Sequence, residues 1–336
     1  MKRGILIILG LAVSAGAMAW SMRDVRLSEL KEGVLGADYR TLPLILLQLF
    51  VFYWLKAARW KWLLNPTKRL TTGELFRPVI VGFAANSVLP AHLGEFVRVY
   101  LVNRKHGVSS GTVLSTIVLE RILDVIAILL LFGVGLLFAP SMPEDYRRGA
   151  TVVAGFASCG VVAAAVYLFW TDGFIRITER VLSVVRFLPA GLTGRLLDLL
   201  RQGAAGLHSM KSLRTVVLAL LNSLAQWTLN GTGAVLALRA FQVEVDLSTG
   251  LILTGITAFG VMIPAAPGYF GVIQVCFEAA MQAQELKPPA ALVFGASVYS
   301  QMAGMIPVVL LGFYFLYRDH LSLRSLQREA RAGADS

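Results

Sequence analysis

The chain has 336 residues, of which 56% are hydrophobic and only 15% are charged, and its formal net charge is +11. A typical soluble domain is about 45–50% apolar and about 25% charged, so this composition excludes an ordinary soluble enzyme as well as a disordered chain. The basic residues lie between apolar segments, as anionic membrane lipids require, which argues against a nucleic-acid partner. We therefore predict an all-α polytopic membrane protein.

Six apolar stretches approach the length of about 20 residues that a helix needs to cross a bilayer. They cover residues 4–20, 41–57, 111–138, 149–170, 215–240 and 290–317. The first stretch has an alternative interpretation, because Lys2, Arg3 and the triplet Ala17-Met18-Ala19 also resemble a secretory signal.

Lysine and arginine favour the cytosolic side of a membrane, and their distribution in this chain fits one orientation. The N-terminus and the tail 319–336 are basic, so both termini are predicted to be cytosolic, in the inner membrane of a bacterium. The same rule places the basic residues that follow the second stretch in a cytosolic segment: Lys56, Arg59, Lys61, Lys68 and Arg69. Apolar residues at helical spacing among the arginines of 172–212 predict amphipathic helices on the inner leaflet, held there by anionic lipids.

Two further apolar stretches, 73–102 and 249–283, are interrupted by proline and glycine. Arms of about 10–14 residues reach about 15–21 Å, which is less than the hydrocarbon core of about 30 Å. Each stretch is therefore predicted to form a re-entrant hairpin, the first on the inner side and the second on the outer side. The alternative is that they are tilted helices with proline kinks.

With these hairpins, residues 1–138 and 149–318 form two repeats of opposite orientation. The expected fold is about six transmembrane helices plus two re-entrant hairpins in an inverted repeat. Inverted repeats with broken segments in matching places are typical of transporters, whose binding site lies near the membrane midplane.

Charged residues within the apolar stretches are the first candidates for a site, because a charge at the bilayer centre costs about 2.5–3.5 kcal/mol on insertion scales. They are Glu95, Arg98, Glu120, Arg121 and Asp124, and their spacing of three or four residues lets several share a helix face. Two interpretations stay open. The cluster binds a charged headgroup or carries protons, or it pairs internally and fixes the first hairpin to the third span.

Uncharged polar residues give weaker signals. Amides recur every four positions in the fifth span, at Asn222, Gln226 and Asn230, and interhelical hydrogen bonds explain them. Gln274 and Glu278 share a face of the second hairpin and are expected to face the cavity opposite Glu95. His92 lies at the first break. No catalytic, nucleotide-binding or metal-ligand motif is found, so we expect no catalytic residue, metal or cofactor.

Over about residues 5–318 the sequence resembles the transmembrane region of lysylphosphatidylglycerol synthases, a flippase-like family. The resemblance depends on the order and spacing of many residues: Asn86, Pro90, Ala91, His92, Leu93, Gly94, Glu95, Arg98, Leu101, Arg104, Lys105, Gly107, Ser109, Glu120, Arg121, Asp124, Pro264, Pro267, Gly268, Gly271, Tyr299 and Pro307. It implies a membrane region that flips a lipid made by a separate cytosolic aminoacyltransferase domain. Only about 19 residues follow the last span here, so the resemblance argues against synthase activity. Stand-alone relatives are associated with lipid handling, including polyprenyl- or hopanoid-linked pathways.

Three positions depart from the family pattern. The family usually has arginine where His92 stands and glutamate where Gln274 stands, and often arginine where Ser300 stands. The resemblance therefore implies a substrate less charged than an aminoacylated phospholipid, or a different coupling.

The function we predict is a lipid translocase that moves an amphiphile with a polar or anionic headgroup between leaflets. The residues expected to bind this substrate are Asn86, Pro90, His92, Glu95, Arg98, Glu120, Arg121, Asp124, Pro267, Gly268, Gly271, Gln274 and Glu278. One alternative is a non-catalytic accessory protein that supports a lipid- or polyprenyl-linked glycosyltransferase, docking through 172–212. Another is an intramembrane transferase that uses Glu95, Glu120 and Asp124 as acid–base groups. The lipid, the direction, the energy coupling and the oligomeric state do not follow from the sequence.

Overall fold

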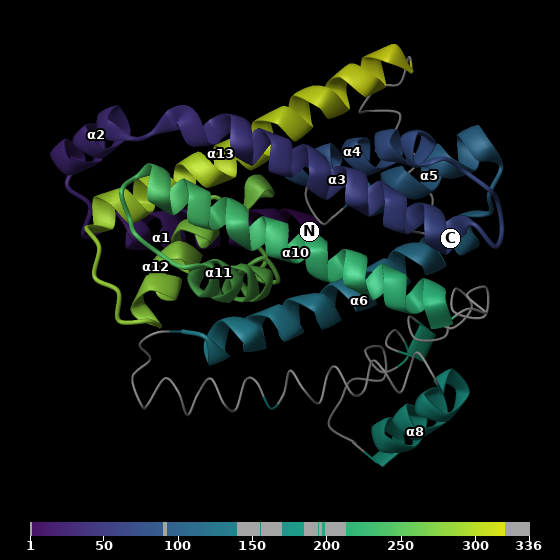
Figure 1. The fold of residues 1–336 in the computed structure, drawn as a ribbon. Helices are drawn as coiled ribbons and strands as arrows, with labels where there is room; N and C mark the ends of the chain where they lie inside the picture. Colours follow the sequence, from purple (N-terminus) through teal and green to yellow (C-terminus); the bar gives the residue numbers. More distant parts are fainter. Residues whose placement is uncertain are drawn as a thin grey trace.

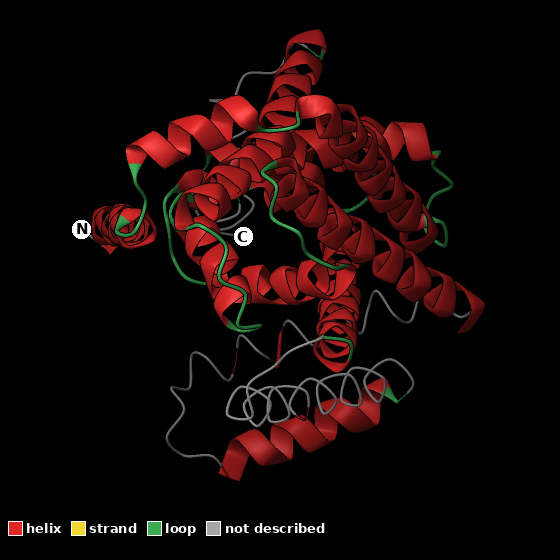
Figure 2. Cartoon of the chain, turned by 60° about the vertical axis from the view of Figure 1, so that its left-hand side comes forward, coloured by secondary structure: helices red, strands yellow, loops and turns green. Residues whose placement is uncertain are grey.

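The computed structural model describes residues 2–89, 93–139, 170–184 and 213–319, with the isolated positions 155, 194, 197 and 198. All regular secondary structure in this part of the chain is helical (Figure 2). The prediction of an all-α fold is therefore confirmed.

The helices pack side by side in the body that Figure 1 shows. They are α1 (Lys2–Met22), α2 (Leu27–Gly36), α3 (Leu42–Leu64), α4 (Thr72–Val88), α5 (Gly94–His106), α6 (Ser110–Leu137), α8 (Thr171–Val184), α10 (Leu213–Ala240), α11 (Leu247–Gly260), α12 (Val272–Gln282) and α13 (Ala290–Arg318), with 3-10 turns η1 (Tyr39–Thr41) and η2 (Pro267–Tyr269). Helices occupy five of the six predicted spans, and almost all of 149–170 lies outside the described residues. By length and hydropathy, Tyr39–Leu64 and Ala290–Arg318 are long and apolar enough to cross a membrane.

Local sequence explains where several helices begin and end. Thr71 and Glu74 form a capping box at the start of α4, in which each side chain bonds the other residue's backbone N–H. The Ser109 side chain accepts a hydrogen bond at the start of α6. Helix α5 ends at Gly107, whose φ of 67° is the left-handed conformation that glycine adopts without strain.

Both interrupted stretches form a helix, a break and a second helix. The first break separates α4 from α5, and the second break, which contains η2, separates α11 from α12. The four helices have 17, 13, 14 and 11 residues. At 1.5 Å per residue they are about 17–26 Å long, so each is shorter than a hydrocarbon core of about 30 Å.

The backbones of α4 and α5 approach one another closely at two glycines. A Cβ atom placed on Gly94 would lie 1.9 Å from the carbonyl oxygen of Gly82, so the contact requires the absence of a side chain. The side chain of Asn86 reinforces it, because its Oδ1 accepts a hydrogen bond from the Gly94 backbone N–H at 2.8 Å.

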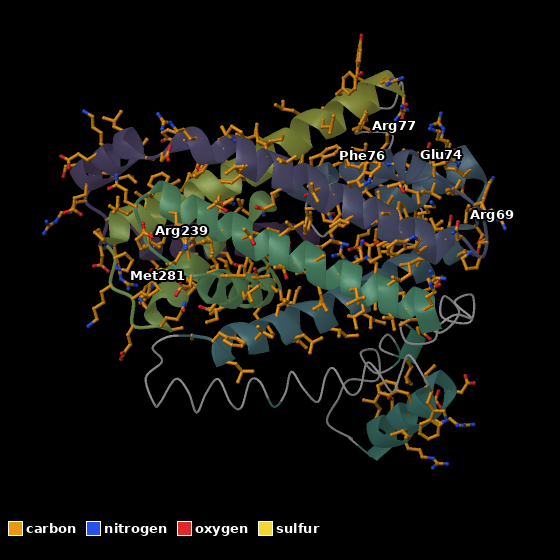
Figure 3. All side chains as sticks on the ribbon, viewed as in Figure 1. Arg69, Glu74, Phe76, Arg77, Arg239 and Met281 are labelled. Atoms are coloured by element: carbon orange, nitrogen blue, oxygen red, sulfur yellow. The ribbon has the colours of Figure 1, made fainter. Side chains whose placement is uncertain are left out.

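The two helix pairs open towards opposite ends of the body. Arg69, Glu74 and Arg77, at the open end of α4–α5, lie far from Arg239 and Met281, at the open end of α11–α12 (Figure 3). The packing partners also exchange between the halves. Helix α4 packs on α13 while α11 packs on α6, and the pairs α3–α4 and α5–α6 are matched by α10–α11 and α12–α13.

Two hydrophobic clusters hold these elements together. One surrounds Trp60 and Leu123 and includes Phe174 and Ile175 of α8, while Arg176 on the same helix is exposed. Most of the predicted amphipathic segment beyond α8 lies outside the described residues. The other cluster surrounds Phe277 and joins α10, α11, α12 and α13.

Helix α1 packs against the second break. The Ser14 hydroxyl accepts a hydrogen bond from the Ala266 backbone N–H at 2.9 Å, and the backbone of Gly271 lies directly against that of Ser14.

Candidate functional site

A cavity of about 400 Å³ lies between the last turn of α4, which precedes the first break, and the second break. Asn86 and Ser87 from the end of α4 line it on one side, and Gly268 and Tyr269 from η2 line it on another. Helices α3, α6, α10, α11, α12 and α13 complete its wall. The volume falls within the range of about 300–1,000 Å³ that is usual for small-molecule sites.

The wall of the cavity is mixed in character. Arg121 is the one charged side chain among the described lining residues. Four amide side chains also reach it: Gln48, Asn86, Asn230 and Gln301. Aromatic rings supply much of the remaining surface, from Phe52, Tyr53, Phe83, Tyr269 and Phe277. Convergent polar groups in an otherwise apolar cavity are typical of a binding site.

Arg121 is held by Glu95 of α5 but keeps donors for another partner. Its Nε and Nη2 lie 2.8 Å and 2.6 Å from the same carboxylate oxygen, Oε1 of Glu95. The Arg121 side chain is 39% exposed, and its Nη1 has no hydrogen bond or ion pair within the described part of the chain. Because a guanidinium carries five N–H donors in a planar fork, the free edge suits a second anionic oxygen.

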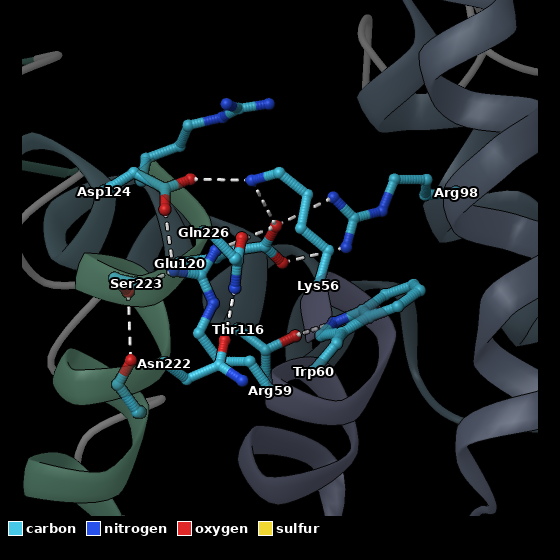
Figure 4. Close-up of polar contacts among 12 residues, drawn as sticks. Lys56, Arg59, Trp60, Arg98, Thr116, Glu120, Asp124, Asn222, Ser223 and Gln226 are labelled. Carbon is cyan, nitrogen blue, oxygen red and sulfur yellow. Dashed lines mark hydrogen bonds and ion pairs between the residues drawn. The ribbon is translucent and has the colours of Figure 1, made fainter. Parts of the chain in front are cut away.

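A buried network of charges lies behind this cavity (Figure 4). Asp124 of α6 contacts Lys56 Nζ at 3.1 Å and Arg59 Nη1 at 2.6 Å, both from α3. Glu120 of α6 contacts Arg98 Nη2 at 2.9 Å and Arg59 Nη2 at 3.3 Å, with Lys56 at 4.0 Å. The network thus joins α3, α5 and α6, and it holds three cations against two carboxylates.

Neutral side chains complete the network. Trp227 of α10 donates its Nε1–H to Asp124 Oδ1 at 2.9 Å, and Arg59 donates to the hydroxyl of Ser223. Lys56 Nζ lies 5.1 Å and 5.4 Å from the ring centroids of Phe52 and Phe83, which also line the cavity. Two aromatic rings that line the cavity therefore also lie against the network.

The prediction that Lys56 and Arg59 follow the second span is wrong, because both lie inside its helix and are buried in the protein. Helix α3 does not end at residue 57 but continues to Leu64, and the two side chains are 1% and 0% exposed. The carboxylates of Glu120 and Asp124 supply the counterions that make this burial possible. Arg98 of α5 likewise pairs with Glu120 of α6 rather than with Glu95 on its own helix.

The other residues predicted to bind substrate fall into distinct places. Asn86, Arg121 and Gly268 line the cavity, and Glu95 contacts it through Arg121. Pro267 is exposed in η2, Gly271 packs against α1, and Pro90 and His92 lie outside the described residues. Contrary to the prediction, Glu278 does not line this cavity, because it pairs with Arg23 at 2.9 Å near the end of α1.

Gln274 faces a protein partner rather than the cavity. Its Nε2 donates to Gln301 Oε1 at 2.7 Å, and its Oε1 accepts from the Gly271 backbone N–H at 2.6 Å. Gln301 also donates to the carbonyl oxygen of Gly268. Neutral amides thus tie the second break to α13, whereas ion pairs tie α5 to α6.

Sequence reasoning missed several cavity residues, among them Gln48, Tyr53, Tyr269 and Gln301. Gln48 and Gln301 carried a usable signal, because each is an amide within an otherwise apolar span. The two tyrosines carried none, because aromatic residues are ordinary in membrane helices.

The fold and the site define an all-helical membrane protein with an internal cavity that polar and aromatic side chains line. The chain belongs to the lysylphosphatidylglycerol synthase TM region family, whose sequence model matches residues 7–315. It is 25% identical to glycosyltransferase AglD of Haloferax volcanii over 92% of this chain and 54% of that protein, so it spans about half the length of this relative. It is 22% identical to a UPF0104 membrane protein of Methanocaldococcus jannaschii over 70% of this chain and 95% of that protein.

Proposed function

We propose that this chain is a translocase that moves an amphiphilic lipid between the leaflets of a bacterial inner membrane, with both termini in the cytosol. The observation that carries the proposal is the cavity of about 400 Å³ between the end of α4 and the second break, with Arg121 in its wall. The headgroup would occupy this cavity while the acyl or prenyl tails stay in the lipid.

The arrangement of the helices supports a transporter of the inverted-repeat type. Each member of the pairs α4–α5 and α11–α12 is too short to cross the hydrocarbon core, so each pair acts as a re-entrant hairpin. The hairpins open towards opposite ends (Figure 3), and their packing partners exchange between the halves. Irregular backbone at membrane depth is tolerated where it lines a cavity, as the second break does through Gly268 and Tyr269.

The cavity lining lowers the main energetic cost of lipid movement, which is the transfer of the polar headgroup into hydrocarbon. A polar headgroup that enters hydrocarbon without hydrogen-bond partners costs several kcal/mol, and a charged one costs more. The amides and Arg121 offer such partners inside the helical body. The network behind the wall fixes α3, α5 and α6 around that position.

The proposal is tested with the purified chain in liposomes that contain trace fluorescent lipids and are treated with a membrane-impermeant quencher. We expect the fluorescent lipids to exchange between leaflets faster than in protein-free liposomes, and we expect the variant Arg121→Glu to lose this acceleration. Arg26→Gln is the matched control, because Arg26 is exposed and pairs only with the nearby Glu29 in the described structure. Exchange that Arg121→Glu leaves unchanged, in protein shown to be folded, would contradict the proposal.

A second candidate function is that of an accessory protein in a lipid-linked glycosyltransferase pathway. It is favoured by the relative named glycosyltransferase AglD, which matches 92% of this chain. Under this proposal the amphipathic segment 172–212 forms a docking surface. Deleting that segment would then abolish glycan transfer in cells while Arg121→Glu is tolerated, whereas the translocase proposal requires that Arg121→Glu abolishes activity.

A further inference from the structure

We infer that the cavity selects a headgroup that carries one negative charge and hydroxyl groups but no ammonium group. This inference rests on the proposed function, because it names the substrate class of the same cavity. Three features of the site carry it: the balance of charge around the cavity, the absence of a carboxylate from its described lining, and the hydrogen-bond donors left over on its amides.

The charge balance around the cavity favours one anion. Among the described residues, the network together with Arg121 and its partner Glu95 contains four cations and three carboxylates: Lys56, Arg59, Arg98 and Arg121 against Glu95, Glu120 and Asp124. Each carboxylate is already within 4.0 Å of at least one cation. A single phosphodiester beside the free edge of Arg121 would bring the sum to zero in a region where uncompensated charge is costly.

An ammonium group finds no counterion in the same cavity. None of the described lining residues is a carboxylate, and Oε1 of Glu95 is occupied by Arg121. The excess positive charge of the network lies just behind the Phe52 and Phe83 rings and repels a second cation. A headgroup that adds an amine to its phosphate is therefore disfavoured.

The amide side chains provide donors for hydroxyl groups. Asn86 uses its Oδ1 inside the protein, on the Gly94 N–H at 2.8 Å, whereas the Asn230 Oδ1 lies 3.5 Å from the Thr254 hydroxyl, which donates to the Gly250 carbonyl oxygen at 2.9 Å. Their Nδ2 groups have no partner within the described part of the chain and belong to cavity-lining residues. Free amide donors beside aromatic rings match a glycerol or sugar headgroup, which offers hydroxyl oxygens and an apolar C–H face.

The test uses two measurements on the full chain. Lipid retention is measured by native mass spectrometry in detergent, and movement is measured with the quencher assay in liposomes. Four probes share the same acyl chains: phosphatidylglycerol, phosphatidylethanol, phosphatidylethanolamine and lysylphosphatidylglycerol. Phosphatidylethanol has the negative charge of phosphatidylglycerol without its hydroxyl groups, and the last two lipids carry an amine.

We expect phosphatidylglycerol to be retained at least about tenfold more than either amine-bearing lipid. Arg121→Gln should abolish this preference and Arg121→Lys should keep part of it. Asn230→Leu should reduce the preference for phosphatidylglycerol over phosphatidylethanol without affecting the discrimination against amines. Arg26→Gln should leave all four retention values unchanged.

The two measurements separate this inference from the proposed function. Movement of all four lipids at equal rates, or stronger retention of lysylphosphatidylglycerol, would overturn the inference while leaving translocation intact. Selective retention of phosphatidylglycerol that depends on Arg121, without movement of any lipid, would support the inference and contradict translocation.

Discussion

Replacing Asp124 by asparagine tests whether the buried network is held by charge compensation. The change preserves the shape of the side chain but removes the counterion of Lys56 at 3.1 Å and of Arg59 at 2.6 Å. The charge of the five-residue network rises from +1 to +2. Removing one partner of a buried ion pair costs about 3–5 kcal/mol, because a desolvated charge is left behind, and we expect a loss in free energy of unfolding of that size.

The matched variant is Lys56→Met, which removes a charge of the opposite sign from the same ion pair. It brings the network from +1 to 0 and leaves Asp124 in contact with Arg59 and with Trp227 at 2.9 Å. Because the network becomes neutral, Asp124 keeps Arg59 as its counterion at 2.6 Å, and methionine is similar in volume to lysine, we expect a loss of only about 1 kcal/mol or less.

Unfolding in mixed micelles with increasing denaturing detergent, followed by circular dichroism, measures both free energies. The double variant Asp124→Asn with Lys56→Met should recover part of the loss of the first, and the coupling energy follows from the cycle. Equal losses in the two single variants, or a larger loss in Lys56→Met, would refute the argument from net charge.

Three further predictions concern other elements. Thr71→Ala removes one half of the capping box and should cost about 1 kcal/mol in the same unfolding measurement, whereas no loss would show that the cap does not matter. Gly94→Ala places a methyl group against the Gly82 carbonyl oxygen and should prevent folding. The control is Gly73→Ala in α4, where a Cβ meets nothing within 4 Å, and it should be neutral or slightly stabilising. Equal yields of folded protein from the two variants would contradict this prediction. Gln301→Leu removes the hydrogen bonds of Gln301 to Gln274 and to the Gly268 carbonyl oxygen. Because a neutral hydrogen bond contributes only about 1 kcal/mol, the unfolding midpoint should change little while the rate of lipid exchange changes clearly. The unfolding measurement and the quencher assay check the two parts.

The positions of helices and breaks could be predicted because they depend on local signals. The length of the apolar stretches predicted six spans, and the structure has helices over five of them. Pro90 and Gly268 indicated the positions of the two breaks. Glu120 and Asp124 could be predicted to face inward because their cost in lipid does not depend on which partner they find.

The partners of these charges could not be predicted, because they are set by tertiary packing. Spacing along α5 allowed Glu95 and Arg98 to pair, yet each contacts a different residue of α6. Lys56 and Arg59 follow an apolar stretch as flanking basic residues commonly do, so the positive-inside rule placed them in water. The usable signal lay in α6, since two buried carboxylates require cations from another helix.

The helix pairs α4–α5 and α11–α12 differ in what holds them, and this difference has a consequence for motion. In the first pair, α5 is joined to α6 by the ion pairs of Arg98 and Arg121, and in the second the break is joined to α13 by the amides of Gln274 and Gln301. A broken neutral hydrogen bond is readily replaced by one to water, whereas a separated buried ion pair is not. Under the proposed function we therefore expect the second pair to move during transport while the first pair stays fixed against α6.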